Sequence, residues 1–300
     1  LSDLETLQKR VVKKPEYIKY YLGSSNIENL NFSQDKNRFA SRNRIQKKED
    51  YSYIEIYIFM KLLYSCIVSS DFYATYDYMN SEIDDFGIIN DVDVLINQYK
   101  NTDLYTSIEN YKSYKMGKVT DNPYKDIPIN RLRTEMFLEA EKNLIENIDS
   151  NIFYLEAPTG GGKTNISINL ALKIIKEKKE FNKVFYIFPF NSLIEQTKES
   201  LDNLFNEMEG GRGVAVVNSI TPIITYEEKM EGEVLGSIDY EKHLLNRQFM
   251  HYPIVLTSHI NFFNYLFGIG KEVNFPFIHL CNSVIIIDEI QSYRNDIWKE

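Results

Sequence analysis

Short apolar runs alternate with segments of helical periodicity over the C-terminal half of the chain. The runs are rich in β-branched and aromatic residues and lie at 152–155, 184–188, 214–217, 254–256 and 284–287. Between them, apolar positions recur with helical spacing at about 131–148, 164–179, 192–206 and 260–267. Strands that alternate with helices in this way are typical of a parallel sheet covered on both faces. The pattern therefore predicts an α/β fold.

The N-terminal half has a different pattern, which predicts helices. Scattered apolar positions favour a helix over residues 1–22, and the apolar segment 51–80 is long enough for one or two buried helices. Pro123 and Pro128 then mark a domain boundary. Later in the chain, a charged insertion at 220–245 predicts a loop with a helix. The predicted domains are 1–127, all helical, and 128–300, which is α/β.

Composition narrows the class of protein. Hydrophobic residues make up 43% of the chain and charged residues 26%, which excludes a disordered or fibrous protein. Two cysteines are too few for a disulfide framework or a thiolate metal cluster, so we expect a reducing, cytoplasmic setting. The apolar stretch 53–68 is interrupted by Glu55 and Lys61, so we expect no membrane span.

The formal net charge of −9 argues against a protein that binds nucleic acid by bulk electrostatics. A local basic groove remains compatible with that charge. One basic run consists of Lys36, Arg38, Arg42, Arg44, Lys47 and Lys48. This run is either a solvated surface or a surface that contacts phosphates.

The segment 157–164 carries the most specific signal in the sequence. It reads Ala157-Pro158-Thr159-Gly160-Gly161-Gly162-Lys163-Thr164 and lies between a predicted strand and a predicted helix, the context of a phosphate-binding loop. Glycines let the backbone wrap around phosphates, and N–H groups at a helix N-terminus attract the anion. Lys163 would reach the β- and γ-phosphates, and the Thr164 hydroxyl would bind Mg²⁺. The loop predicts an ATP·Mg²⁺ site rather than an ordinary turn, because the Lys-Thr pair fits phosphate binding.

An acidic pair follows the last predicted strand. Asp288 and Glu289 come directly after the run 284–287. In a nucleotide-hydrolysing site, the first carboxylate holds Mg²⁺ and the second orients and deprotonates the attacking water. An acidic pair after a strand is a weak signal alone, but in the same sheet as the loop at 157–164 it predicts the catalytic half of the site.

Four motifs, taken in order, resemble those of superfamily 2 helicases. They are APTGGGKT at 157–164, FPFNSLIEQT at 188–197, IVLTSHINFF at 254–263 and IIIDEIQSY at 285–293. More narrowly, the chain resembles the CRISPR-associated helicase/nuclease of type I interference systems. The residues that carry this narrower resemblance are LLYSCIVSSDFYAT at 62–75, NRLRTEMFLEAEKNL at 130–144, YLEAPTGGGKT at 154–164 and the spelling DEIQSY.

The resemblance implies a domain plan. Members of that family join an N-terminal HD-type metal nuclease to two RecA-like helicase lobes. Residues 1–127 would then be the C-terminal part of the nuclease domain with a linker, and residues 128–300 the first RecA-like, ATP-binding lobe. We expect the nuclease histidines and the second lobe to lie outside these residues, because all four histidines, the first of them His243, lie in the later part of the chain.

The resemblance also implies roles for single residues. Strand-end residues would contact the nucleic-acid backbone or, alternatively, cap helices: Pro189, Asn191, Ser192, Thr257 and Ser258. Gln291 would couple the γ-phosphate to the second lobe. Arg131 or Arg133 stands where relatives place an adenine-reading Gln, and we expect Arg133 to contact ATP. Asp71 would bind a divalent transition metal of the nuclease or, alternatively, cap a helix. His259 is expected to pack or cap rather than catalyse.

The resemblance leads to a specific functional prediction. It predicts an ATP-dependent translocase and helicase on single-stranded DNA, recruited by a CRISPR RNA-guided surveillance complex, in which ATP hydrolysis drives unwinding coupled to cleavage by the HD nuclease. One alternative is another superfamily 2 motor, such as a restriction-type translocase. A second alternative is a nucleotide-switch module without turnover, which Glu289 disfavours because a switch needs no catalytic base.

Overall fold

The computed structural model describes residues 53–79, 85–205, 214–217 and 244–293. It divides the chain into two units, 1–63 and 64–300. The helix predicted at 1–22 and the basic run between residues 36 and 48 lie outside the described residues, as does nearly all of the insertion predicted at 220–245.

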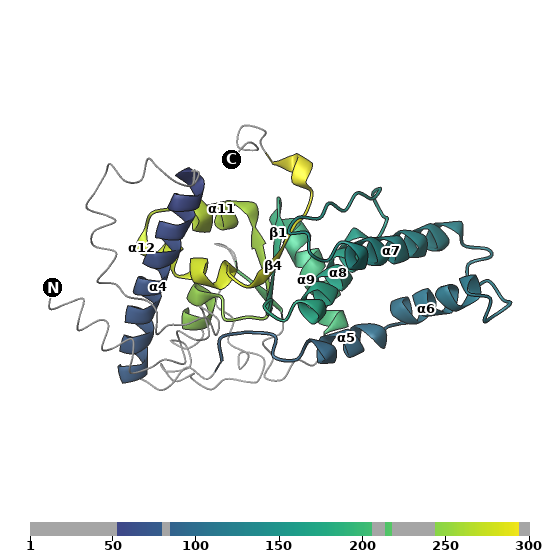
Figure 1. The fold of residues 1–300 in the computed structure, drawn as a ribbon, viewed down its shortest axis with the longest axis horizontal. Coiled ribbons are helices and arrows are strands. Elements are labelled where there is room, and N and C mark those ends of the chain that lie inside the picture. The colour runs from purple at the N-terminus through teal and green to yellow at the C-terminus, as the bar shows by residue number, and fades with distance from the viewer. Residues whose placement is uncertain (1–52, 80–84, 206–213, 218–243, 294–300) are drawn as a thin grey trace, which may run out of the picture. The chain divides into compact units, whose positions relative to one another are not determined.

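The second unit is built on a parallel sheet (Figure 1). Its strands within the described residues are β1 (Lys183–Phe188), β2 (Val214–Val216), β3 (Ile254–Ser258) and β4 (Ser283–Ile287), in the spatial order β2-β3-β1-β4. Every neighbouring pair is parallel, with Ile187 opposite both Thr257 and Ile287. The predicted α/β fold with a parallel sheet is confirmed.

Helices cover both faces of the sheet because side chains of β1 alternate between two apolar clusters. Tyr186 and Phe188 pack into a cluster with residues of α8 (Lys163–Glu177) and α9 (Asn191–Leu204). Phe185 and Ile187 pack into a second cluster with α11 (His259–Phe267). Both faces of strand 184–188 are therefore buried. A strand that is buried on both faces has a continuous run of apolar residues in the sequence.

The helices that lie between residue 91 and the loop at 157–164 pack against the same side of the sheet as α8. They are α5 (Val92–Lys100), α6 (Asp103–Lys115) and α7 (Pro128–Glu146). Asp91 caps α5, Thr102 caps α6, and Pro128 occupies the first turn of α7, where a missing N–H costs nothing. The helices α5, α6 and α7 share one apolar cluster with α8 and the sheet. The chain between β3 and the acidic pair adds α12 (Lys271–Asn274) and the 3₁₀ turn η4 (Pro276–Leu280).

The predicted strand at 152–155 is not part of the sheet. These residues have no assigned strand or ladder partner, and their side chains are largely exposed, with Tyr154 at 85% and Ile152 at 72%. The prediction is wrong here because apolar, β-prone sequence makes a strand only when a neighbouring strand supplies hydrogen bonds. Among the described residues, no strand pairs with the outer side of β4, the edge strand of the sheet.

The apolar segment predicted at 51–80 forms one helix, α4 (Tyr53–Met79). Within Ile54–Met79, an 18-residue window has a mean hydropathy of 1.2 and is 28% buried, so by length and composition alone this helix could cross a membrane. The expectation of no membrane span, which rested on Glu55 and Lys61, stays a prediction. The same test is also passed by core helices of proteins that never enter a membrane.

Buried polar groups join the later half of α4 to the base of the sheet. The Tyr73 hydroxyl hydrogen-bonds to Nε2 of His251 at 2.8 Å and to Nε2 of His279 at 3.0 Å. Nearby, Nζ of Lys183, at the start of β1, donates to the carbonyl oxygens of Phe86 at 3.1 Å and Met250 at 2.8 Å. Burial lowers the pKa of Lys183 to about 7. These hydrogen bonds offset the free-energy cost of removing the polar side chains from water.

A glycine next to this cluster allows two backbone segments to meet. Gly87 has φ +62°, and a Cβ there would lie 2.0 Å from the carbonyl carbon of His251 and 2.0 Å from the backbone N of Tyr252. We expect Gly87→Ala to lower the free energy of unfolding by about 2–5 kcal/mol, since it adds overpacking to left-handed strain. Gly117→Ala is the control, because Gly117 also has a positive φ, +70°, but a Cβ there would have no atom within 4 Å beyond its chain neighbours. This substitution should lower the free energy of unfolding by about 1–2 kcal/mol. Urea unfolding measures both, and equal losses would contradict the packing argument.

Candidate nucleotide-binding and catalytic site

The loop at 157–164 ends in an uncapped helix N-terminus. Gly162 is the N-cap of α8 with φ +83°, a left-handed conformation that favours glycine, and no side chain caps the helix. The backbone N–H groups of the first turn are the natural partners of an anion, and the dipole of a 15-residue helix adds to the attraction. The local geometry therefore matches the predicted phosphate-binding loop.

The acidic pair lies at the C-terminal end of β4, next to β1. The backbone N–H of Asp288 donates to the carbonyl oxygen of Ile187 at 2.9 Å, which extends the β1–β4 ladder by one residue. The chain then turns sharply at Glu289, which has φ +48° and whose N–H donates to Oδ1 of Asp288 at 2.9 Å. This turn separates the two neighbouring carboxylates, so they can take different roles.

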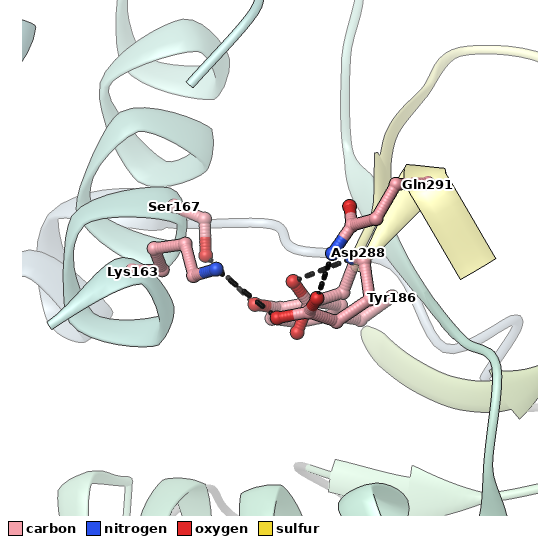
Figure 2. A network of polar contacts seen from close by, with 6 residues as sticks. Lys163, Ser167, Tyr186, Asp288 and Gln291 are labelled. Carbon is pink, nitrogen blue, oxygen red and sulfur yellow. Dashed lines mark hydrogen bonds and ion pairs between the residues drawn. The ribbon is translucent and has the colours of Figure 1, made fainter. Parts of the chain in front are cut away.

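The loop and the acidic pair meet in one site (Figure 2). Nζ of Lys163 donates to Oε1 of Glu289 at 3.0 Å. Nε2 of Gln291, in the 3₁₀ turn η5 (Ile290–Ser292), donates to the other carboxylate oxygen of Glu289. The hydrogen bond from Lys163 is the main cause that lowers the pKa of Glu289. Glu289 is therefore a bound counter-ion of Lys163 in this state.

The oxygen ligands present fit Mg²⁺. Burial raises the pKa of Asp288, so its carboxylate lies where a positive charge would be stabilising. Mg²⁺ prefers oxygen ligands and is bound in such sites by one or two carboxylates together with substrate phosphates. Asp288 and the Thr164 hydroxyl, on neighbouring elements, supply ligands of that kind.

A cavity of about 660 Å³ adjoins the loop and is large enough for a nucleotide. The loop residues 159–164, with Asp288 and Glu289, line one part of it. Asn165, Ile166 and Leu193 also belong to the lining. A second part is lined by residues of α6, α7 and the segment between them: Asp103, Leu104, Ser107, Ile108, Tyr124, Asn130, Arg133, Thr134 and Phe137. This second part has an apolar wall, which suits the flat ring of a base.

Arg133 connects the two parts of the cavity. Its Nε donates to the carbonyl oxygen of Gly160 at 2.7 Å, and Nη1 donates to Oδ1 of Asn130 at 3.2 Å. Arg131 is not among the residues that line the cavity. Of the two arginines that the sequence left open, the structure places Arg133 at the phosphate-binding loop.

The residues predicted to contact nucleic acid lie at the same edge of the sheet as Asp288. Pro189 is buried, whereas Asn191 and Ser192 are exposed in the first turn of α9. Thr257 is fully buried and its hydroxyl donates to the carbonyl oxygen of Val217 at 2.6 Å. Ser258 is the N-cap of α11. The contacts with nucleic acid remain a prediction. Only Ser258 has the helix-capping role of the alternative, because the Thr257 hydroxyl bonds to a neighbouring backbone carbonyl and caps no helix.

Asp71 lies within α4 and is exposed. The capping alternative is wrong for this residue because the helix continues to Met79. Within the described residues, no group of three or more His, Cys, Asp or Glu side chains is placed to hold a metal ion. His259 packs its ring edge-on against Tyr293 at 5.1 Å, in agreement with the expected packing role.

Sequence reasoning missed two contributions to the site. The cavity wall from α6 and Tyr124 comes from the region predicted as a separate helical domain, where no motif marks it. Tyr186 reads as a core residue of a buried strand, but its hydroxyl hydrogen-bonds to Ser167 of α8 at 2.9 Å. The sequence does contain one indication of this contact. Tyr186 is a residue with a hydroxyl group on the face of β1 that packs against α8, the helix that follows the phosphate-binding loop.

These features together define a P-loop nucleotide hydrolase: a phosphate-binding loop, an acidic pair on a neighbouring parallel strand and a cavity beside them. The family model for the DEAD/DEAH box helicase matches residues 135–299, more than half of the chain. The chain belongs to this family. Its fold is that of a RecA-like helicase domain, and membership assigns it to ATP hydrolases that act on nucleic acid, with ATP and Mg²⁺ as cofactors. A search of curated proteins gives no match.

The contact of Arg133 with the loop leads to a test that separates the two arginines. We expect Arg133→Ala to weaken ATP binding about tenfold or more, because a charge-assisted hydrogen bond that shapes the loop is worth about 1.5–3 kcal/mol. Arg131→Ala removes the same charge from the same helix and should change the affinity less than twofold. Calorimetric titration with ATP and Mg²⁺ measures both. Equal losses would show that net charge, not the contact with Gly160, is responsible.

Proposed function

We propose that this chain contains the first motor lobe of an ATP-dependent translocase and helicase on single-stranded DNA. The observation that carries the proposal is the contact between Lys163 and Glu289, which joins the phosphate-binding loop to the candidate catalytic base. Family membership supports the ATP-dependent helicase activity. The choice of single-stranded DNA rests on the narrower resemblance described above.

Nucleotide binding would exchange the partner of Lys163. The Lys163 and Glu289 side chains are 29% and 31% exposed, and an ion pair at such exposure is worth less than about 1 kcal/mol. A phosphate in the loop would therefore displace Glu289 easily. The freed carboxylate, with a pKa no longer lowered by Lys163, would orient the attacking water and accept its proton.

The other residues of the site would hold the substrate. Bound Mg²⁺ supplies charge neutralisation between the β- and γ-phosphates, and Thr164 and Asp288 are the residues that would hold it. The N–H groups of the first turn of α8 would bind the phosphates, and Arg133 would keep the loop in shape. Gln291, already bonded to Glu289, is placed to pass the state of the γ-phosphate to a second lobe.

We further propose that the motor works in CRISPR interference, in the cytoplasm, recruited by an RNA-guided surveillance complex. The segments 62–75 and 130–144 and the spelling DEIQSY support this. In such a protein, an HD nuclease would cut the strand that the motor pulls, and residues 1–127 would include the end of that nuclease domain.

Substitutions of Lys163 and Glu289 test the proposed motor site, in which Lys163 changes its partner from Glu289 to phosphate. Lys163→Ala should weaken ATP binding at least tenfold, because it removes a charged donor to phosphate. Glu289→Gln should bind ATP as tightly as the wild type or up to about fivefold more tightly, since it removes the competing ion pair. In a protein with both lobes, Glu289→Gln should also abolish hydrolysis, because an amide cannot accept the proton. Titration and phosphate release measure these effects. Wild-type affinity in Lys163→Ala would refute the site.

The proposed nuclease is tested separately at Asp71. In a protein that also carries the nuclease histidines, Asp71→Ala should abolish DNA cleavage and leave ATP hydrolysis near normal, because a metal ligand is lost outside the motor site. Glu55→Ala removes a carboxylate from the same helix and should leave both activities unchanged. A cleavage assay on labelled single-stranded DNA measures the nuclease activity, and an ATPase assay measures ATP hydrolysis. Cleavage at the wild-type rate in Asp71→Ala would exclude this residue as a metal ligand.

A further inference from the structure

The cavity beside the phosphate-binding loop contains a pair of buried hydroxyl groups in its second part. Oγ1 of Thr134, in α7, donates to Oη of Tyr124 at 3.2 Å. The two residues are 4% and 8% exposed, and both line the cavity. Asn130 and Phe137, four residues before Thr134 and three residues after it, line the cavity as well, so Thr134 lies on the face of α7 that forms the wall. The hydroxyl pair is therefore placed at the cavity.

The turn before α7 holds Tyr124 in position. Its backbone N–H donates to Oδ1 of Asn122 at 3.0 Å, and its carbonyl oxygen accepts from the N–H of Ile127 at 3.2 Å. Its ring packs against the ring of Tyr111 in α6, with centroids 5.3 Å apart and planes 42° apart. The backbone, the ring and the bond to Thr134 thus fix the place of the Tyr124 hydroxyl.

One proton of the hydroxyl pair is left over. Two hydroxyl groups carry two protons, and the single hydrogen bond between them uses one. Thr134 donates in this bond, so the remaining proton belongs to Tyr124. Within the part of the chain that the structure describes, no acceptor receives this proton. Buried donors in proteins are nearly always paired, so the Tyr124 hydroxyl is suited to an acceptor that enters the cavity.

A nucleotide bound at the loop would bring its base to this part of the cavity. Arg133 contacts the loop at Gly160, and the next residue of α7, Thr134, bonds to Tyr124. Ile108 and Phe137, 2% and 4% exposed, line the same part of the cavity and offer apolar surface to a flat ring. The acceptors of adenine are its ring nitrogens N1, N3 and N7, whereas its amino group is a donor.

We propose that Tyr124 is a base-reading residue, whose hydroxyl donates its remaining proton to a ring nitrogen of adenine. The inference rests on the proposed function and adds to it a residue from the segment between α6 and α7, outside the phosphate-binding loop and the acidic pair. A base that enters the cavity displaces solvent from the hydroxyl and must supply an acceptor in its place. A base with carbon at that position would leave a buried donor unpaired, which is how such a contact selects its ligand.

Tyr124→Phe tests the inference, because phenylalanine keeps the ring and removes only the hydroxyl. In a titration with ATP and Mg²⁺, its affinity should be about three- to tenfold lower than that of the wild type, the usual effect of one neutral hydrogen bond. Inorganic tripolyphosphate can occupy the loop but has no base. The affinity for tripolyphosphate should therefore be unchanged within about twofold.

Analogues of ATP in which carbon replaces one ring nitrogen identify the contact. The 1-deaza, 3-deaza and 7-deaza analogues are titrated into the wild type and into Tyr124→Phe. For one of them, we expect the wild type to bind about three- to tenfold more weakly than it binds ATP, and the variant to show no further loss. A hydroxyl that only supports helix packing would make the variant lose the same factor for ATP and for every analogue, which would overturn the inference.

Tyr111→Phe is the matched control. Tyr111 is 2% exposed, and its hydroxyl donates to Oε1 of Glu135 in α7 at 2.6 Å, but Tyr111 is not one of the described residues that line the cavity. This variant removes a tyrosine hydrogen bond to the same helix, from the neighbouring ring. It should change the ATP affinity less than about twofold. Equal losses in Tyr111→Phe and Tyr124→Phe would overturn the inference, since loosening of α7 would explain both.

The remaining outcomes separate the inference from the proposed function. If the wild type binds neither ATP nor tripolyphosphate, the proposed nucleotide site is wrong and the inference falls with it. If the wild type binds ATP no more tightly than tripolyphosphate, or binds all the deaza analogues as tightly as ATP, the site stands and only the role of Tyr124 is wrong. These measurements need the wild type alone, so they can overturn the inference even if thermal unfolding shows that Tyr124→Phe does not fold.

Discussion

The parallel register of β1 between β3 and β4 determines where the acidic pair and the candidate residues at the strand ends lie. Because all three strands run in the same direction, their C-terminal ends meet at one edge, with Phe188 opposite Ser258 and Ile187 opposite Ile287. The bond from Asp288 N–H to the Ile187 carbonyl then fixes the first carboxylate. A slip of one residue would turn the side chains of β4 to the opposite face, and the acidic pair would no longer meet α8.

At that edge, the charges of the site balance one another before any nucleotide is present. The positive Lys163 and the negative Glu289 neutralise each other at small net gain, because both remain partly exposed to solvent. A stronger, buried pair would hold the lysine too tightly for a phosphate to compete. Partial exposure of this pair therefore allows one lysine to serve first as partner of the base and then as partner of the substrate.

The sequence predicted those parts of the fold that depend on local pattern. The loop 157–164, the acidic pair and strands β1 to β4 were found, because periodicity and motif spacing encode them. The strand predicted at 152–155 was wrong, since pairing depends on a neighbouring strand and not on the apolar residues alone. The α6 wall of the cavity was missed because packing between distant segments has no local signal. The role of the Tyr186 hydroxyl was missed because Tyr186 lies in a continuous apolar run, whose residues are expected to be buried core residues.

The cluster of Tyr73, His251 and His279 has a consequence for the protonation of its rings. A phenol has one proton to give, so it donates to one imidazole and accepts from the other, and the two rings must be opposite tautomers. Oδ1 of Asn246 lies 3.3 Å from Nδ1 of His251 and accepts the proton there, which leaves Nε2 of His251 to accept from Tyr73. His279 then carries its proton on Nε2. The base of the sheet thus contains two histidines that differ in chemistry although they share one partner.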